Sequence, residues 1–159
     1  MALSCEKKST DLTITDELAT DSLVTIPESN EPIESSTLQT CYMEATGKDS
    51  VFISLEDNLG TITGKMRYKN FEKDSSFGDV VGNQNGDTLK LVYRFQAEGT
   101  TSDREIYFLK KEGNIIEGIG DQKTEGKAAT YSNTANIKYD GHSLSQVDCI
   151  DFDKNFKVK

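Results

Sequence analysis

The residues best suited to binding chemistry lie in the segment RFQAEGTTSDREIYF, residues 94–108. Glu98, Ser102, Arg104 and Glu105 gather there at the turn between two aromatic-rich strands. An arginine guanidinium can bind a carboxylate or a phosphate through two parallel hydrogen bonds. The segment is therefore a candidate for the edge of a small ligand pocket.

Three more side chains bear on the same hypothesis. Glu105 alternates with Tyr107 along its strand, which predicts that the carboxylate points into the fold. Tyr68 and Tyr93 would add hydroxyl groups to the same lining, because a tyrosine joins an apolar ring to a polar end. The structural alternative is an ion pair, between Arg104 and either Glu98 or Glu105, that orders the hairpin.

The sequence lacks the usual signals for catalysis and metal binding. His142 is the only histidine, and it lies in a predicted turn after Asp140 and Gly141. No CxxC, HExxH, P-loop or GxSxG motif occurs. Residues 151–155, DFDKN, begin like a calcium-binding loop, but Phe156 stands where that loop needs glycine. We predict no catalytic residue, no metal ligand, no cofactor and no enzyme activity.

Apolar and polar residues alternate along most of the chain after residue 38. Every second residue is apolar in 51–55, in 62–68 and again in 89–95, which is the period of a half-buried strand. Asn85-Gly86 separates two such segments and is typical of a tight hairpin turn. A last pair of strands is expected to turn at Asp140-Gly141.

Eight or nine short strands joined by regular turns predict an all-β fold. A small antiparallel up-and-down β-barrel of about eight strands, lipocalin-like or calycin-like, is favoured because closure removes exposed sheet edges. Such a barrel holds side chains or one small ligand. Gly64, Gly82 and Gly118 would permit sharp coiling. A β-sandwich is the structural alternative.

Residues 1–38 differ in composition from the rest of the chain. They hold both prolines, no glycine, no aromatic residue and a net charge of −6 out of −9. Such a segment cannot bury enough apolar surface to fold. We predict a disordered acidic Ser/Thr-rich tether at 1–38, a barrel domain at 39–150 and a flexible tail at 151–159. A short helix or strand within DLTITDEL or DSLVTI is the alternative.

The charge of the chain bears on its partners. Nucleic acids need clustered lysine and arginine, and this chain is acidic, with a pI near 4.6. No apolar run is long enough to span a bilayer. Nucleic acid is therefore not a predicted partner.

The three cysteines have two predicted roles. Cys41 and Cys149 lie in the first and last strands of the predicted barrel, which would be neighbours, so we expect a disulfide there. Two separate thiols are the alternative. Cys5 follows Ala2-Leu3-Ser4, which resembles the lipobox end of a bacterial lipoprotein signal, although the usual upstream apolar stretch is missing. Acylation of Cys5 would make the bilayer a partner; a free thiol is the alternative.

The segment FEKDSSFG, residues 71–78, predicts a longer loop between two strands. Phe71 and Phe77 would either cap one end of the barrel or, if exposed, form a partner-binding patch.

Several phrases of residues 39–149, among them KDSV, FEKD, NGDTL and FLKK, resemble a group of small, uncharacterised lipoproteins from Bacteroidota, of the flavobacterial type. The resemblance implies a location in the cell envelope or outer membrane and a lipid anchor on Cys5. It implies no activity.

Together these patterns predict a membrane-anchored envelope lipoprotein with a non-catalytic barrel. The favoured function is binding of a small amphipathic or apolar ligand. The alternative is a protein-binding or inhibitor module, like small lipoproteins that inhibit lysozyme, acting on an envelope protein through the barrel loops.

Overall fold

The computed structural model describes residues 37–157. The predicted tether, the alternative helix or strand within it, and Cys5 lie outside the described residues. Neither of the short helices in the described part is long and apolar enough to cross a membrane.

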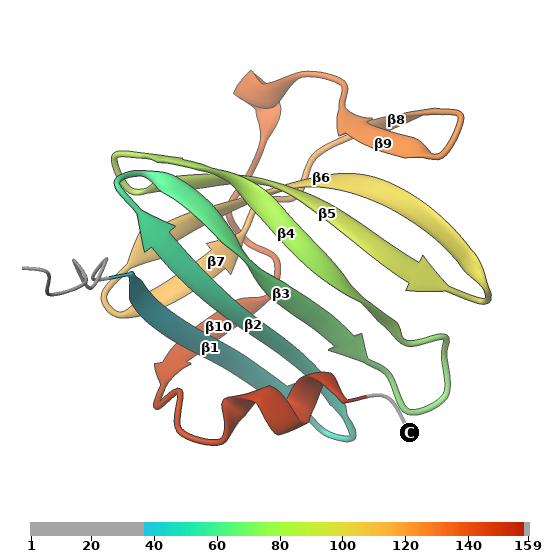
Figure 1. The fold of residues 1–159 in the computed structure, drawn as a ribbon. Helices are drawn as coiled ribbons and strands as arrows, with labels where there is room; N and C mark the ends of the chain where they lie inside the picture. Colours follow the sequence, from blue (N-terminus) through green and yellow to red (C-terminus); the bar gives the residue numbers. More distant parts are fainter. Residues whose placement is uncertain (1–36, 158–159) are drawn as a thin grey trace, which may run out of the picture. The chain divides into compact units, whose positions relative to one another are not determined.

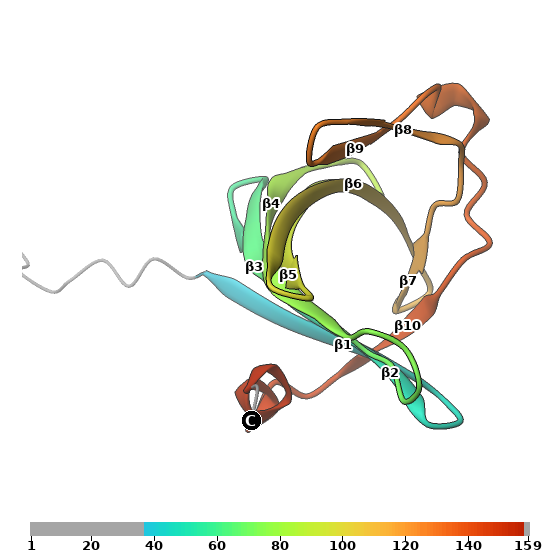
Figure 2. The ribbon, with the colours of Figure 1, turned by 90° about the vertical axis from the view of Figure 1, so that its right-hand side faces the viewer.

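Eight antiparallel strands of the described chain close into a barrel (Figures 1 and 2). Each strand from β1 to β6 pairs with the next, and β10 pairs with both β7 and β1, which completes the circle. The strands are β1 (Leu38–Thr46), β2 (Asp49–Asn58), β3 (Thr61–Lys69), β4 (Ser76–Asn85), β5 (Thr88–Ala97), β6 (Thr100–Lys111), β7 (Asn114–Glu117) and β10 (Ser143–Val147). The predicted barrel is confirmed, and the sandwich alternative is wrong.

The inward faces of the strands follow the predicted alternation. Residues 51, 53 and 55 of β2 and residues 89, 91 and 93 of β5 are buried in the core. Fourteen buried side chains fill the interior: Tyr42, Val51, Ile53, Leu55, Ile62, Met66, Val80, Leu89, Leu91, Tyr93, Ile106, Phe108, Ile115 and Leu144. The middle of the barrel is therefore a packed core of protein side chains.

Glycines in three places, Gly64 and Gly82 among them, allow neighbouring strands to approach closely. A Cβ atom at Gly64 would collide with the carbonyl oxygen of Ser54 on β2, and one at Gly82 would collide with that of Lys90 on β5. Both collisions involve backbone, which cannot move aside as a flexible side chain does. These close contacts explain glycine at positions 64 and 82, whereas Gly118 follows the end of β7 and lies in no strand.

A short hairpin interrupts the path from β7 to β10. Strands β8 (Gln122–Glu125) and β9 (Ala128–Tyr131) lie outside the barrel beside β6, with which β9 pairs in parallel (Figure 2). The 3-10 helix η2 (Thr134–Asn136) follows. The expected pair of strands turning at Asp140-Gly141 is wrong in its first half, because Lys138 forms only an isolated bridge with Ile119.

The chain beyond β10 packs on the outer face of the barrel. The 3-10 helix η3 (Phe152–Phe156) buries its two phenylalanines in a cluster with Cys41 and Phe52. Arg67 of β3 donates from Nη1 to the carbonyl oxygens of Asn155, at 2.9 Å, and Lys157, at 3.1 Å. The prediction of a flexible tail at 151–159 is therefore wrong for residues 151–157, since two aromatic side chains four residues apart hold the segment against the barrel.

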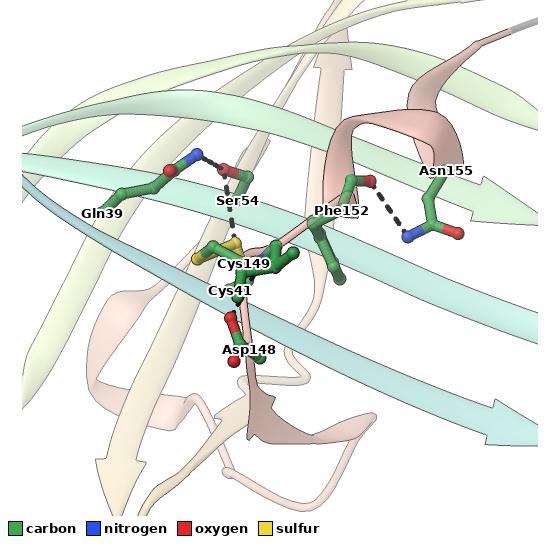
Figure 3. The surroundings of a disulfide bond; sticks show 8 residues. Gln39, Cys41, Ser54, Asp148, Cys149, Phe152 and Asn155 are labelled. Carbon is green, nitrogen blue, oxygen red and sulfur yellow. Dashed lines mark hydrogen bonds between the residues drawn. A yellow bond between two sulfur atoms is a disulfide. The ribbon is translucent and has the colours of Figure 1, made fainter.

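The Cys41–Cys149 disulfide is present, as predicted (Figure 3). Its Cα atoms lie 5.4 Å apart and its cysteines are separated by 108 residues. Cys41 faces Val147 across the β1–β10 pair. The bond therefore joins the two ends of the barrel domain next to the seam where the sheet closes.

Candidate functional site

Charged and aromatic side chains gather at the barrel end that carries the β1–β2, β3–β4 and β5–β6 turns. We call this ring the mouth. Its members are Glu44, Tyr68, Phe95, Ser102, Arg104 and Glu117, together with His142 just before β10. Side chains alternate between the two faces of a strand, so these inward-facing side chains lie between the last apolar residues of the core and the end of the barrel.

An ion pair inside the barrel wall forms the centre of the mouth. Arg104 of β6 donates from Nη2 to Oε1 of Glu117, the last residue of β7, at 3.2 Å. The Tyr68 hydroxyl donates to the same oxygen at 3.3 Å. The Glu117 side chain is 2% exposed, whereas that of Arg104 is 36% exposed. Within the described residues, Nε of Arg104 is buried and has no hydrogen-bond partner.

Burial governs the ionisation of these groups. Desolvation raises the pKa of the Glu117 carboxyl above its usual range, although Arg104 and His142 oppose that shift. Desolvation, reinforced by the nearby Glu117, raises the pKa of Tyr68 well above its usual range. Tyr68 is therefore a neutral hydroxyl donor at physiological pH.

Three aromatic rings form the apolar part of the mouth. The ring of Tyr93 stacks on Phe95 with centroids 4.8 Å apart and meets Tyr68 edge-on at 5.9 Å. Burial raises the pKa of Tyr93 to about 12. Its hydroxyl is 3.1 Å from Oγ of Ser76 and donates to the Met66 carbonyl oxygen at 3.3 Å. Tyr93 thus forms the floor of the mouth, and its polar end is already satisfied.

His142 lies at one side of the mouth. Its ring lies 5.8 Å from that of Tyr68, and its Nδ1 contacts Oε2 of Glu44 on β1. The backbone amide of Ser143 donates to the other Glu44 oxygen at 3.3 Å. The histidine that the sequence places in a turn therefore has a specific carboxylate partner.

Of the residues predicted to bind a ligand, five lie at this end, and four of them belong to the mouth or form its floor. Tyr68, Tyr93 and Arg104 are brought together, and Ser102 shares the inward face of β6 with Arg104, across from Phe95. The partner of Arg104 is Glu117, so the predicted ion pair with Glu98 or Glu105 is wrong.

Glu105 and Glu98 lie outside the group of side chains around Arg104. Glu105 points outward, contrary to the prediction: its carboxylate accepts from the Tyr131 amide at 3.0 Å and from the Tyr107 hydroxyl at 3.3 Å. Glu98 occupies the β5–β6 turn with a φ of 52°. A hydrogen bond to Asp74 raises its pKa.

The two loop phenylalanines have different surroundings. Phe77 packs against Phe156 on the outside of the barrel, with ring centroids 6.3 Å apart. Phe71 is 59% exposed, and Nζ of Lys48 lies 4.0 Å from its ring centroid. Phe71 is therefore exposed, as we expect for a residue of a partner-binding patch.

Four of the cavities in the described chain lie at the barrel ends and on its outer surface. One on the outer face of the barrel, at the same end as the mouth, has a volume of about 230 Å³ and is lined by Arg67, Ser76, Phe77 and Glu98, among others, but by none of the mouth residues. A larger one, of about 600 Å³, lies at the opposite end and is lined mostly by polar residues, including Thr40, Asp87 and Lys110. Tyr42 is the only core residue that lines any of the four.

No group of three or more metal-ligating side chains occurs within residues 37–157. Sequence reasoning missed Glu117, Glu44 and His142 as members of the mouth. The only available signal for Glu117 was an acidic residue at an inward position of the apolar stretch NIIEGIG. Comparison with known proteins gives no match: no family model fits the chain, and no curated protein or solved structure is significantly similar to it.

Proposed function

We propose that this chain is an envelope lipoprotein whose barrel binds a small amphipathic ligand at the mouth and catalyses no reaction. The observation that carries the proposal is the Arg104–Glu117 pair, set among the rings of Tyr68, Tyr93 and Phe95. Moving two charges out of water costs several kcal/mol, and replacement of such a pair by apolar residues is often neutral or stabilising. The pair is therefore better explained by a binding role than by stability.

The ligand lies across the mouth and does not enter the middle of the barrel. The interior is filled by the fourteen core side chains. Tyr68 and Phe95 are only partly buried and offer ring surface.

The proposed anchor rests on the sequence. Ala2-Leu3-Ser4-Cys5 resembles a lipobox, and the acidic, aromatic-free residues that follow have the composition of a tether. Acyl chains on Cys5 would hold the barrel at a membrane, since each buried methylene contributes about 0.8 kcal/mol.

One mass measurement tests both the lipid anchor and the bound ligand of the proposal. The full-length protein is purified from the envelope of a producing bacterium, and its mass is measured first under native and then under denaturing conditions. We expect acyl groups on Cys5 and an additional mass that leaves on denaturation. Arg104→Met should lose that extra mass, whereas Arg94→Met should keep it, because Arg94 pairs with Asp103 on the outer surface. An unmodified Cys5 and an empty wild-type barrel would refute the proposal.

A second candidate function is recognition of an envelope protein through the β3–β4 loop. It is favoured by the exposed ring of Phe71 and by the cavity of about 240 Å³ that Phe71 lines with Lys48 and Asp49. A protein that cross-links to the wild-type barrel and to Arg104→Met, but not to Phe71→Ala, would favour this function over ligand binding.

A further inference from the structure

Arg104 has hydrogen-bonding capacity that the protein does not use. Among residues 37–157, its Nη2 atom alone has a partner, the Glu117 carboxylate. Its Nε atom is buried without a partner among the described residues, yet about a third of the side chain remains exposed. A buried donor without an acceptor costs about 1–3 kcal/mol. A ligand oxygen can approach the exposed part of the side chain.

The shape of the free donor set indicates the type of oxygen. A guanidinium presents coplanar N–H groups that match the two oxygens of a carboxylate, and such paired bonds are stronger and more directional than a bond to a neutral hydroxyl. A ligand ammonium group would instead be repelled by Arg104. The mouth thus selects for an acid over an alcohol or an amine.

Charge balance adds a second condition. Arg104 is already neutralised by Glu117, which is 2% exposed. A ligand carboxylate on Arg104 would leave two carboxylates sharing one guanidinium in a poorly hydrated site, where like charges close together cannot both stay ionised. The titratable groups that face Glu117 are Arg104, Tyr68, His142, Glu44 and Tyr131.

We propose that Arg104 receives the carboxylate of an amphipathic acid and that Glu117 takes up one proton from solvent as the acid anion binds. This inference rests on the proposed function of the mouth and specifies its ligand class. Glu117 is the group that gains the proton because it is the more deeply buried carboxyl: Glu44 is 23% exposed and is paired with His142. In its neutral form Glu117 still accepts from Tyr68 and Arg104 through its carbonyl oxygen.

Three probes with the same alkyl chain separate the head group from the tail. Binding of octanoate, octanol and octylamine to the barrel is measured by isothermal titration calorimetry from about pH 6 to about pH 9, where the ammonium and carboxylate groups of the probes stay charged. We expect octanoate to bind at least about tenfold more tightly than octanol, since its hydrogen bonds to arginine are charge-assisted. Octylamine should bind most weakly.

Proton uptake is read from the same titrations. Octanoate affinity should fall by up to about tenfold per pH unit on the alkaline side, as required for uptake of one proton. The binding enthalpy should vary with the ionisation enthalpy of the buffer. Glu117→Gln, which imitates the protonated acid, should bind octanoate with little pH dependence. Arg104→Met should lose the preference for octanoate, and Arg94→Met should keep it.

The outcomes distinguish this inference from the proposed function. Equal binding of all three probes would overturn the carboxylate inference and leave an amphipathic ligand in place. A preference for octanoate without proton uptake in the wild type would overturn the role of Glu117, whether or not Glu117→Gln folds. If none of the three probes binds, the proposed amphipathic function itself is overturned.

Discussion

Reduction of the Cys41–Cys149 disulfide should lower the free energy of unfolding of the barrel by about 4 to 5 kcal/mol. The bond spans a sequence separation of 108 residues. In the chain-entropy relation, a loop of that length contributes about 4.8 kcal/mol at 25 °C, because the cross-link restricts the unfolded chain. Domains of this size are stable by roughly 5–15 kcal/mol. The reduced barrel should therefore still fold, but with little stability to spare.

The assay is urea unfolding followed by tyrosine fluorescence and far-ultraviolet circular dichroism. Cys5→Ser is the starting variant, because a third thiol would allow disulfide exchange. Cys41 is 0% exposed, so the bond is reduced in denaturant before the protein is refolded in reductant. The dependence of the free energy on urea should also steepen, since the reduced unfolded chain exposes more surface.

A Cys41→Ala/Cys149→Ala pair in the same background is the control. It should resemble the reduced protein and show no response to reductant. A loss below about 1 kcal/mol together with an unchanged urea dependence would refute the reasoning. That result would mean that the bond constrains the unfolded chain no more than residual structure already does.

Three further predictions concern the packing and ionisation of the barrel. Gly64→Ala should destabilise it by about 1–3 kcal/mol or more in urea unfolding, because the new Cβ meets the Ser54 carbonyl. Phe156→Ala should release the C-terminal residues to limited proteolysis, read by mass, while the circular dichroism of the barrel is unchanged. Since burial raises the pKa of Tyr93 to about 12, the folded state binds more protons than the unfolded one above the ordinary value of 10.0. Stability should therefore fall as pH rises from about 10 to about 12, and less so in Tyr93→Phe.

The sequence predicts those parts of the fold in which one face of a strand is clearly apolar. Residues 89–95 offer a single reading, because charged side chains occupy the alternate positions Lys90 and Arg94. The position of the disulfide follows from closure of the barrel, since the first and last strands of a closed up-and-down sheet become neighbours.

The sequence could not predict which face of β6 points into the barrel, because both of its faces are partly apolar. Ile106 and Phe108 point inward with Arg104, but Tyr107 and Leu109 lie on the other face with Glu105. A shift of one residue exchanges the two faces of a strand. The outer face is apolar because the β8–β9 hairpin covers it: the ring of Tyr131 lies 5.1 Å from that of Tyr107.

The C-terminal segment was misread for a related reason. DFDKNF is too polar and too short to predict a core element, and only its two phenylalanines carry a packing signal. Their partners, Cys41 and Phe52, lie on the outward faces of β1 and β2. Five consecutive buried residues in β2, 51–55, are the mark of this second layer, since a strand covered on one face alternates between buried and exposed.

The β8–β9 hairpin also explains why an ion pair lies in the barrel wall. β6 pairs with β7 only at its residues 108–111. At its residues 103 and 104, β6 pairs with β9 instead. Between these two pairings, separate hydrogen bonds and not a paired strand occupy the backbone carbonyls of β6. The Gly118 amide donates to the Tyr107 carbonyl at 2.7 Å, and Nε2 of Gln122 donates to the Glu105 carbonyl at 3.0 Å.

The early end of β7 therefore sets the position of Glu117. Because β7 stops at Glu117, that carboxylate lies at the last inward position of a short strand. Glu117 pairs with Phe108 of β6, and the Arg104 side chain reaches it from four residues farther along that strand. A longer β7 would continue the regular sheet past this point and cover the guanidinium. The excursion between β7 and β10 thus leaves Arg104 partly open to solvent, and the proposed ligand would need that opening.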